Sequence, residues 1–277
     1  MPYGGDIQDL TRTKSLSFKH AMACDYPQFK LRRARIARRI DLWTRFADHI
    51  ISGCDWVEYM YHWDTLMLGH FSIDLELWKP PANTPSLSNH SRDTILRILH
   101  APNHRTIKGT NFFIQAVKEL AEEGIGVELI LLERVPNSKV REVMSTVDVV
   151  ADQLVIGWYA MFALEAMAME KPVLCYLRDD LMNLYIDAGI IELNEIPIIN
   201  CSTRTIKEAI RHLAQMNRED LRKIGQRSRE FAERHHSLES VGKVFLQINQ
   251  RIGIQPTNSL VAETGSDFDG QHQTELS

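Results

Sequence analysis

The sequence has few cysteines, a small net charge and no long hydrophobic run. Its 277 residues include four cysteines, which form no Cys-x-x-Cys pair. Their scatter indicates neither a metal site nor a disulfide framework, and a reducing compartment fits best. The N-terminal segment lacks the apolar core of a signal peptide, and no window of about 18 apolar residues could span a membrane. We therefore expect a cytoplasmic protein that holds no metal.

The weak charge and the missing glycine motifs exclude further classes of protein. A net charge of −4 gives no field that would draw the whole protein to nucleic acid. No Gly-x-Gly-x-x-Gly follows any predicted strand, which disfavours a dinucleotide-binding enzyme. With 44% hydrophobic and 25% charged residues, the composition is that of an ordinary globular protein.

What the sequence does contain, after residue 93, is a regular alternation of apolar runs and helical segments. The apolar runs predict strands at 94–102, 126–134, 147–156, 171–177 and 196–201. Helices are predicted at about 110–123, at 136–145, around Glu165, and at 203–215, 218–235 and 237–252. Apolar strands that alternate with helices indicate an α/β protein with a doubly wound parallel sheet. Such sheets bind ligands at the carboxyl ends of their strands.

The N-terminal third is less regular. Residues 28–51 predict an amphipathic helix, with Ile36 and Ile40 on its apolar face and the basic run Arg32–Arg39 opposite. Two interpretations of the arginines remain open: a solvated face, or a patch that binds an anionic acceptor or a membrane surface and makes the protein peripheral. A short strand is expected around "GCDWVEYM".

The loop after the first predicted strand, "HAPNHRTIKGT" (100–110), is basic. Arg105 and Lys108 precede Gly109, where the next helix opens. Because helix N-termini attract anions and arginine grips phosphate, the loop predicts a diphosphate site. The alternative is a merely solvated loop.

The stretch "GWYAMFALEAMAM" (157–169) places one carboxylate, Glu165, on a helix that is otherwise small or apolar. A charge on a buried helix is costly unless something pairs with it. Glu165 is therefore either a structural core carboxylate or a group that faces a ligand. Trp158 and Tyr159 are likewise either core residues or a surface on which a ligand ring stacks.

Four stretches resemble the retaining glycosyltransferases of the "group 1" family, which have the two-domain GT-B fold. "LEAMAMEKPVLCY" (164–176) is the most specific of them. The others are the domain-joining segment "IDLELWKP" (73–80), the loop at 100–110, and the closing helices in "RSREFAERHHSLESVGKVF" (227–245).

The resemblance implies a role for each candidate residue. Glu165 would accept hydrogen bonds from the ribose hydroxyls of a nucleoside-diphosphate sugar, and Arg105 and Lys108 would stabilise the departing diphosphate. The remaining donor-site residues would be Asn103, His104, Gly109, Gly157, Trp158, Tyr159 and Ala160. Transfer would proceed with retention and without a metal or other cofactor, to a carbohydrate, lipid-linked or other acceptor.

Three positions depart from the family pattern. Gly157 stands where the family has the first glutamate of its Glu-x7-Glu motif, Trp158 replaces a glycine, and Asn103 replaces the phosphate-binding arginine. The departures suggest a divergent branch or a weakened enzyme.

The resemblance also divides the chain. We expect a remnant of an acceptor domain at 1–79, a linker at 80–93, the donor-binding domain at 94–236, a closing helix at 237–253 that returns to the first part, and a disordered tail at 254–277. With its acceptor side incomplete, this polypeptide should bind a donor and transfer little. The main hypothesis is a glycosyltransferase; the alternative is a non-catalytic nucleotide-sugar-binding or scaffolding subunit.

Overall fold

The computed structural model describes residues 4–28, 32–81 and 95–254. Most of the predicted linker at 80–93 and the predicted tail beyond Ile254 lie outside these ranges.

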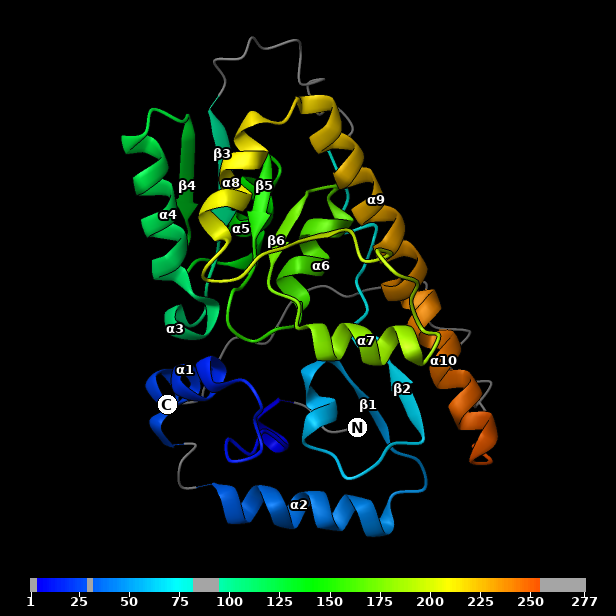
Figure 1. Cartoon of the computed structure of the whole chain (residues 1–277). Coiled ribbons are helices and arrows are strands. Elements are labelled where there is room, and N and C mark those ends of the chain that lie inside the picture. The colour runs from blue at the N-terminus through cyan, green and yellow to red at the C-terminus, as the bar shows by residue number, and fades with distance from the viewer. Residues whose placement is uncertain (1–3, 29–31, 82–94, 255–277) are drawn as a thin grey trace.

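A five-stranded parallel sheet forms the centre of the C-terminal part, as the sequence predicts (Figure 1). Its order is β4-β3-β5-β6-β7. The strands are β3 (Leu96–His100), β4 (Val127–Leu131), β5 (Val149–Ala151), β6 (Val173–Cys175) and β7 (Ile198–Asn200). The chain first adds β4 on one side of β3 and then continues from β5 on the other side. The carboxyl ends of β3 and β5 therefore form the topological switch point, where ligands bind in such sheets.

Helices cover both faces of this sheet, because successive strand residues point to opposite sides and both sets are apolar. Ile98 faces one hydrophobic core and Leu99 the other. The first core is closed mainly by α4 (Thr110–Glu122) and α8 (Ile206–Gln215), and the second by α5 (Asn137–Met144), α6 (Met161–Ala168), α7 (Asp179–Asp187) and α9 (Arg218–His236).

The N-terminal part is built around a two-stranded parallel sheet. Its elements are η1 (Gly4–Asp6), α1 (Leu16–Asp25), α2 (Arg33–Phe46), β1 (Ile51–Gly53), η3 (Cys54–Glu58) and β2 (Thr65–Met67). The strand expected around "GCDWVEYM" is wrong except at Gly53. Cys54 takes a positive φ of 55°, which ends the extended backbone, and a 3-10 helix follows.

The last helix joins the two parts. Helix α10 (Leu238–Arg251) follows α9 along one side of the molecule (Figure 1). Its Val241 and Ile248 share a hydrophobic cluster with Ile51 of β1 and Met67 of β2. At the start of α10, Ser237 forms a parallel bridge with Ile73, in the segment that resembles the family's domain connection.

Candidate functional site

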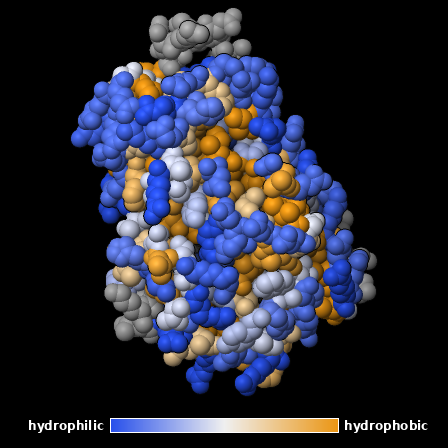
Figure 2. Space-filling view, in the orientation of Figure 1, coloured by the Kyte–Doolittle hydropathy of each residue, from blue (hydrophilic) through white to orange (hydrophobic). Residues whose placement is uncertain are grey.

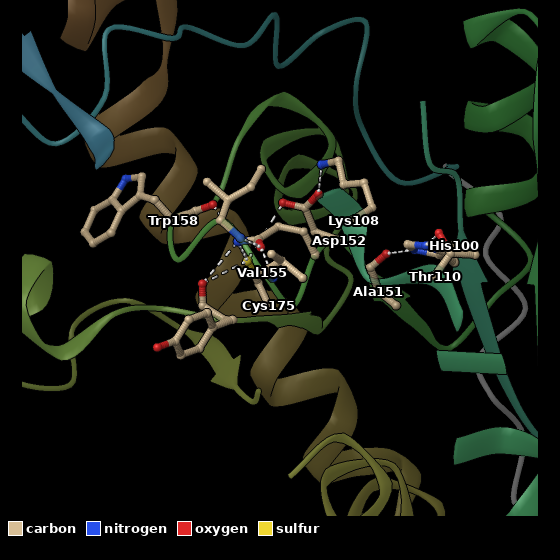
Figure 3. A network of polar contacts seen from close by, with 11 residues as sticks. His100, Lys108, Thr110, Ala151, Asp152, Val155, Trp158 and Cys175 are labelled. Carbon is tan, nitrogen blue, oxygen red and sulfur yellow. Dashed lines mark hydrogen bonds and ion pairs between the residues drawn. The ribbon is translucent and has the colours of Figure 1, made fainter. Parts of the chain in front are cut away.

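A buried histidine ties together the two strands at the switch point. His100 ends β3, and its Nδ1 donates to the carbonyl of Ala151, the last residue of β5, at 2.7 Å. Its Nε2 accepts from the Thr110 hydroxyl at 3.0 Å (Figure 3). Burial lowers the pKa of His100 to about 4, so the ring is neutral and takes this donor and acceptor arrangement. His100 thus fixes where the loops after both strands begin.

Lys108 lies in the loop after β3, at the end of the single-turn helix α3 (Arg105–Lys108). Gly109 ends that turn with a φ of +74°, a backbone conformation that favours glycine. The Lys108 ammonium lies 2.5 Å from Oδ1 of Asp152, the residue after β5 (Figure 3). The Lys108 side chain is 11% exposed and that of Asp152 is fully buried. The ion pair holds the lysine at the carboxyl end of the sheet.

Glu165 of α6 is partly buried and has no ion pair with any other residue that the structure describes. Asn137, at the start of α5, donates to its Oε1 at 3.2 Å. Burial raises the pKa of Glu165 to about 7. The hydrogen bond from Asn137 lowers this pKa, the negative charge of Asp152 raises it, and the positive charge of Lys108 lowers it. Glu165 therefore belongs to the same electrostatic environment as the Lys108–Asp152 pair.

The loop from β5 to α6 is shaped by Gln153, which is fully buried. Its Oε1 accepts from the backbone N–H groups of Val155 and Ile156, and its Nε2 donates to the carbonyl of Trp158 at 2.7 Å. The loop leads into α6, whose N-cap residue, Ala160, provides no side-chain hydrogen bond. The Ala160 carbonyl accepts from the backbone N–H of Ala163, and no side chain at the N-cap accepts from the N–H groups before it.

Gly157 occupies a position that admits no side chain. Its φ is +97°, and a Cβ there would lie 2.3 Å from Cδ of Arg178. The Arg178 guanidinium is held by Glu58 at 3.0 Å and by Asp180 at 2.7 Å. The space beside Gly157 is thus filled by an arginine that is paired across the two parts of the molecule.

Trp158 and Tyr159 lie in the core rather than on a ligand surface. Their rings stack with centroids 5.3 Å apart. Trp158 donates from its indole N–H to the carbonyl of Leu68, and the Tyr159 hydroxyl donates to Nε2 of His236 at 2.8 Å. Both side chains are buried, as the core-packing interpretation expects.

The other residues of the basic loop contact protein groups. Arg105 makes two hydrogen bonds to Glu133, after β4, at 2.6 and 2.7 Å. His104 bonds the Tyr26 hydroxyl, and Asp25 accepts from the backbone N–H of Ile107 at 2.8 Å. The end of α1 therefore covers this turn of the loop, while Asn103 beside it is exposed.

The structure thus brings Lys108, Glu165 and the Gly157–Ala160 backbone to one edge of the sheet. Sequence reasoning missed two residues there, Asp152 and Gln153. The available signal was a polar pair directly after an apolar strand, at the sheet edge where ligands bind.

The comparisons with known proteins bear on the fold. No protein-family model matches the chain, and no curated protein matches it. Solved structures do. A sucrose-phosphate synthase from Thermosynechococcus elongatus is 15% identical, with a TM-score of 0.53 over 78% of this chain and 62% of that one. TarM is 13% identical, with a TM-score of 0.54 over 77% of this chain and 46% of that one.

The chain has the GT-B glycosyltransferase fold. It spans 62% and 46% of the length of those two proteins. A mutant of S. aureus TarM in complex with fondaparinux, alpha-GlcNAc-glycerol and UDP is 12% identical, with a TM-score of 0.53 over 76% of this chain and 45% of that one. At these identities the likeness extends to the GT-B fold alone. Among the residues that the structure describes, none of the helices is both long and apolar enough to cross a membrane.

Proposed function

We propose that the chain is the donor-binding part of a glycosyltransferase that transfers a sugar from a nucleoside-diphosphate sugar with retention and without a metal. Glu165 carries this proposal. It is a partly buried carboxylate that forms no ion pair with the described residues, at the switch point of a GT-B sheet. Asn137 supplies one of the several hydrogen bonds that a carboxylate can accept. Two ribose hydroxyls would supply more and would favour its charged form.

The other groups at this edge suit a diphosphate. The N-terminus of α6 has no side-chain cap at Ala160 and carries a partial positive charge. Lys108 is held in place by Asp152 and adds a full charge. Arg105 would join them by leaving Glu133. Stabilising the charge on a departing nucleoside diphosphate lowers the barrier to transfer.

The complex of a TarM mutant with UDP supports the choice of nucleoside diphosphates as probes.

A non-catalytic nucleotide-sugar-binding or scaffolding subunit is the second candidate, and Gly157 favours it. The resemblance places a sugar-contacting glutamate at this position, where the structure has space for no side chain. Incubation with labelled nucleotide sugars and an acceptor extract separates the candidates. Donor binding with no transfer and no hydrolysis of the donor would favour the scaffolding subunit.

The first test measures thermal unfolding with millimolar UDP, GDP or ADP. A ligand that binds the folded state raises the melting temperature. Glu165→Gln keeps the side-chain size and removes the charge, so it should weaken nucleoside-diphosphate binding by about 1–3 kcal/mol. Glu230→Gln is the matched control, because Glu230 is an exposed residue of α9.

Two results would count against the proposal. Absence of a thermal shift with all three nucleotides would argue against a donor site. Unchanged affinity in Glu165→Gln together with a large loss of stability would make Glu165 a structural carboxylate.

A further inference from the structure

Helix α2 has one face in the core and one face in solvent. Ile36 and Ile40 are buried in the N-terminal hydrophobic cluster. The opposite face is the outer surface of the molecule, because α2 lies at the end farthest from the five-stranded sheet (Figure 1). We define the outer face of α2 as Arg35, Arg38, Leu42, Arg45 and Phe46, which share one side of a helix at 3.6 residues per turn.

The outer face of α2 is basic although the whole chain is acidic. Helix α2 contains five arginines and one aspartate, whereas the net charge of the chain is −4. Arg33 and Arg39 pair with Asp9 and Asp6 of the N-terminal segment. Within the described part of the chain, the three arginines of the outer face form no ion pair. Their charges are available to an anionic partner.

Large apolar side chains lie among these arginines. The exposed fraction is 54% for Leu42 and 74% for Phe46. In the space-filling view, the end of the molecule where α2 lies carries hydrophilic residues with hydrophobic ones between them (Figure 2). A helix surface that mixes arginine with exposed leucine and phenylalanine is typical of helices that lie in a membrane interface.

A pocket of about 380 Å³ opens at the N-terminal end of α2. Three arginines line it, Arg32, Arg35 and Arg39, together with Gly5, Asp6 and Ile36. The Asp6 carboxylate pairs with Arg39, so the arginines outnumber the one carboxylate of the pocket. Arginine binds phosphate through two parallel hydrogen bonds. The volume and the excess of positive charge suit the phosphate of a lipid headgroup. Leu42 and Phe46, which would contact acyl chains, lie further along the same helix.

We propose that the outer face of α2 binds an anionic membrane surface, with a headgroup phosphate in the arginine-lined pocket. The helix would lie flat on the bilayer: the arginines would contact the anionic headgroups, and Leu42 and Phe46 would enter the acyl boundary. This binding does not depend on the nucleotide-sugar site, which lies in the other part of the molecule.

Co-sedimentation of the 277-residue protein with vesicles tests the proposal. The protein should bind phosphatidylglycerol vesicles and not phosphatidylcholine vesicles, and salt should weaken the binding. Arg35→Glu with Arg38→Glu should lower the partition coefficient at least about tenfold. Leu42→Ser with Phe46→Ser should also lower it, because less apolar surface would enter the bilayer. All four residues are exposed, so circular dichroism and the melting temperature should stay unchanged.

The matched control is Arg204→Glu with Arg227→Glu, which makes the same charge change at exposed arginines outside α2. It should bind vesicles as well as the unaltered protein does. If this control lost as much vesicle binding, the change in net charge alone would explain the effect, and the proposal would be overturned. Three other results would also overturn it: no binding to anionic vesicles, binding of free glycerol phosphate without binding of vesicles, or preference for a single-stranded oligonucleotide over vesicles.

Discussion

At the scale of single residues, the central feature is the free-energy cost of burying the carboxyl group of Glu165. Its pKa is raised to about 7, mainly because the surrounding protein excludes water from it. Near neutral pH the folded protein therefore holds a carboxyl group that is partly protonated. Burial of this carboxyl group is destabilising, and a ligand that donated hydrogen bonds to it would offset part of that cost.

The raised pKa gives a sign for the pH dependence of stability. Between the usual glutamate pKa of about 4.5 and the folded value of about 7, the folded state binds more protons than the unfolded state. Stability therefore falls as the pH rises through this range. Glu165→Gln should remove the effect, so the variant should be more stable than the unaltered protein at pH 8, by on the order of 2 kcal/mol after allowance for partial exposure.

Urea unfolding of both proteins at pH 5 and pH 8 measures this difference. Burial also raises the pKa of Asp55 to about 7, but Asp55 is present in both proteins and cancels in the comparison. A difference that is the same at both pH values would contradict the assignment to Glu165.

Sequence reasoning identifies some of these residues and not others, for physical reasons. Glu165 is conspicuous because its neighbours along the helix are apolar, and Lys108 because it lies in a basic loop before a glycine. Asp152 and Gln153 are inconspicuous because their partners, Lys108 and the Trp158 carbonyl, come into contact only through the fold. The ion pairs of Arg105 and Arg178 are invisible in sequence for the same reason.

At the scale of elements, α6 is held by close packing against α9. Gly225 of α9 lies so near α6 that a Cβ at this position would be 2.0 Å from the carbonyl oxygen of Glu170. Arg229, one turn further along α9, donates to the carbonyl of Ala168 at 2.7 Å. Helix α9 thus fixes the C-terminal end of the helix that carries Glu165.

Gly225→Ala should therefore destabilise the protein although alanine is the better helix former. The added methyl group meets backbone, which cannot move aside as a side chain can, and overpacking of this kind costs roughly 1–3 kcal/mol. Gly242→Ala in α10 is the matched control, because its added Cβ would meet no other described part of the protein within 4 Å beyond the adjoining backbone of its own helix. It should be neutral or stabilising by up to about 1 kcal/mol. Denaturant unfolding compares the two, and equal effects would contradict the packing account.

The elements that the sequence predicted correctly are those in which apolar residues recur at a regular spacing. The five strands of the C-terminal sheet and the helices α4, α5, α6, α8, α9 and α10 all lie where apolar periodicity places them. Predicted strands were too long, as at 147–156, where the structure has only Val149–Ala151 because Gln153 binds the backbone of the following loop. The sequence reading gave no helix at α1 or α7. Helix α1 has almost no amphipathic pattern. Helix α7 starts with two aspartates, a residue type that is also common in turns.

At the scale of the whole molecule, the two parts share a core and a buried ion pair. Leu68 and Trp78 of the N-terminal part belong to the same hydrophobic cluster as α6 and α9. Glu58 of η3 pairs with Arg178 before α7, and both side chains are almost fully buried. The parts are therefore expected to unfold together.

Arg178→Met tests this coupling. Methionine keeps the hydrocarbon contact with Gly157 but leaves Glu58 without its cation. Removing one partner of a buried pair costs about 3–5 kcal/mol. Calorimetry should show one transition at a lower temperature, and Arg204→Met, at an exposed position, should show little change. Two separate transitions in the variant would mean that the parts fold independently.

The glycine at position 157 also constrains how this protein can change by mutation. A chain with glutamate there would need to abandon the left-handed backbone at 157 and displace Arg178 in the same step. Displacing Arg178 would in turn leave the buried Glu58 carboxylate without this ion pair. Each single substitution along that path passes through a less stable intermediate. Introducing a glutamate at position 157 would therefore require compensating changes at Arg178 and Glu58.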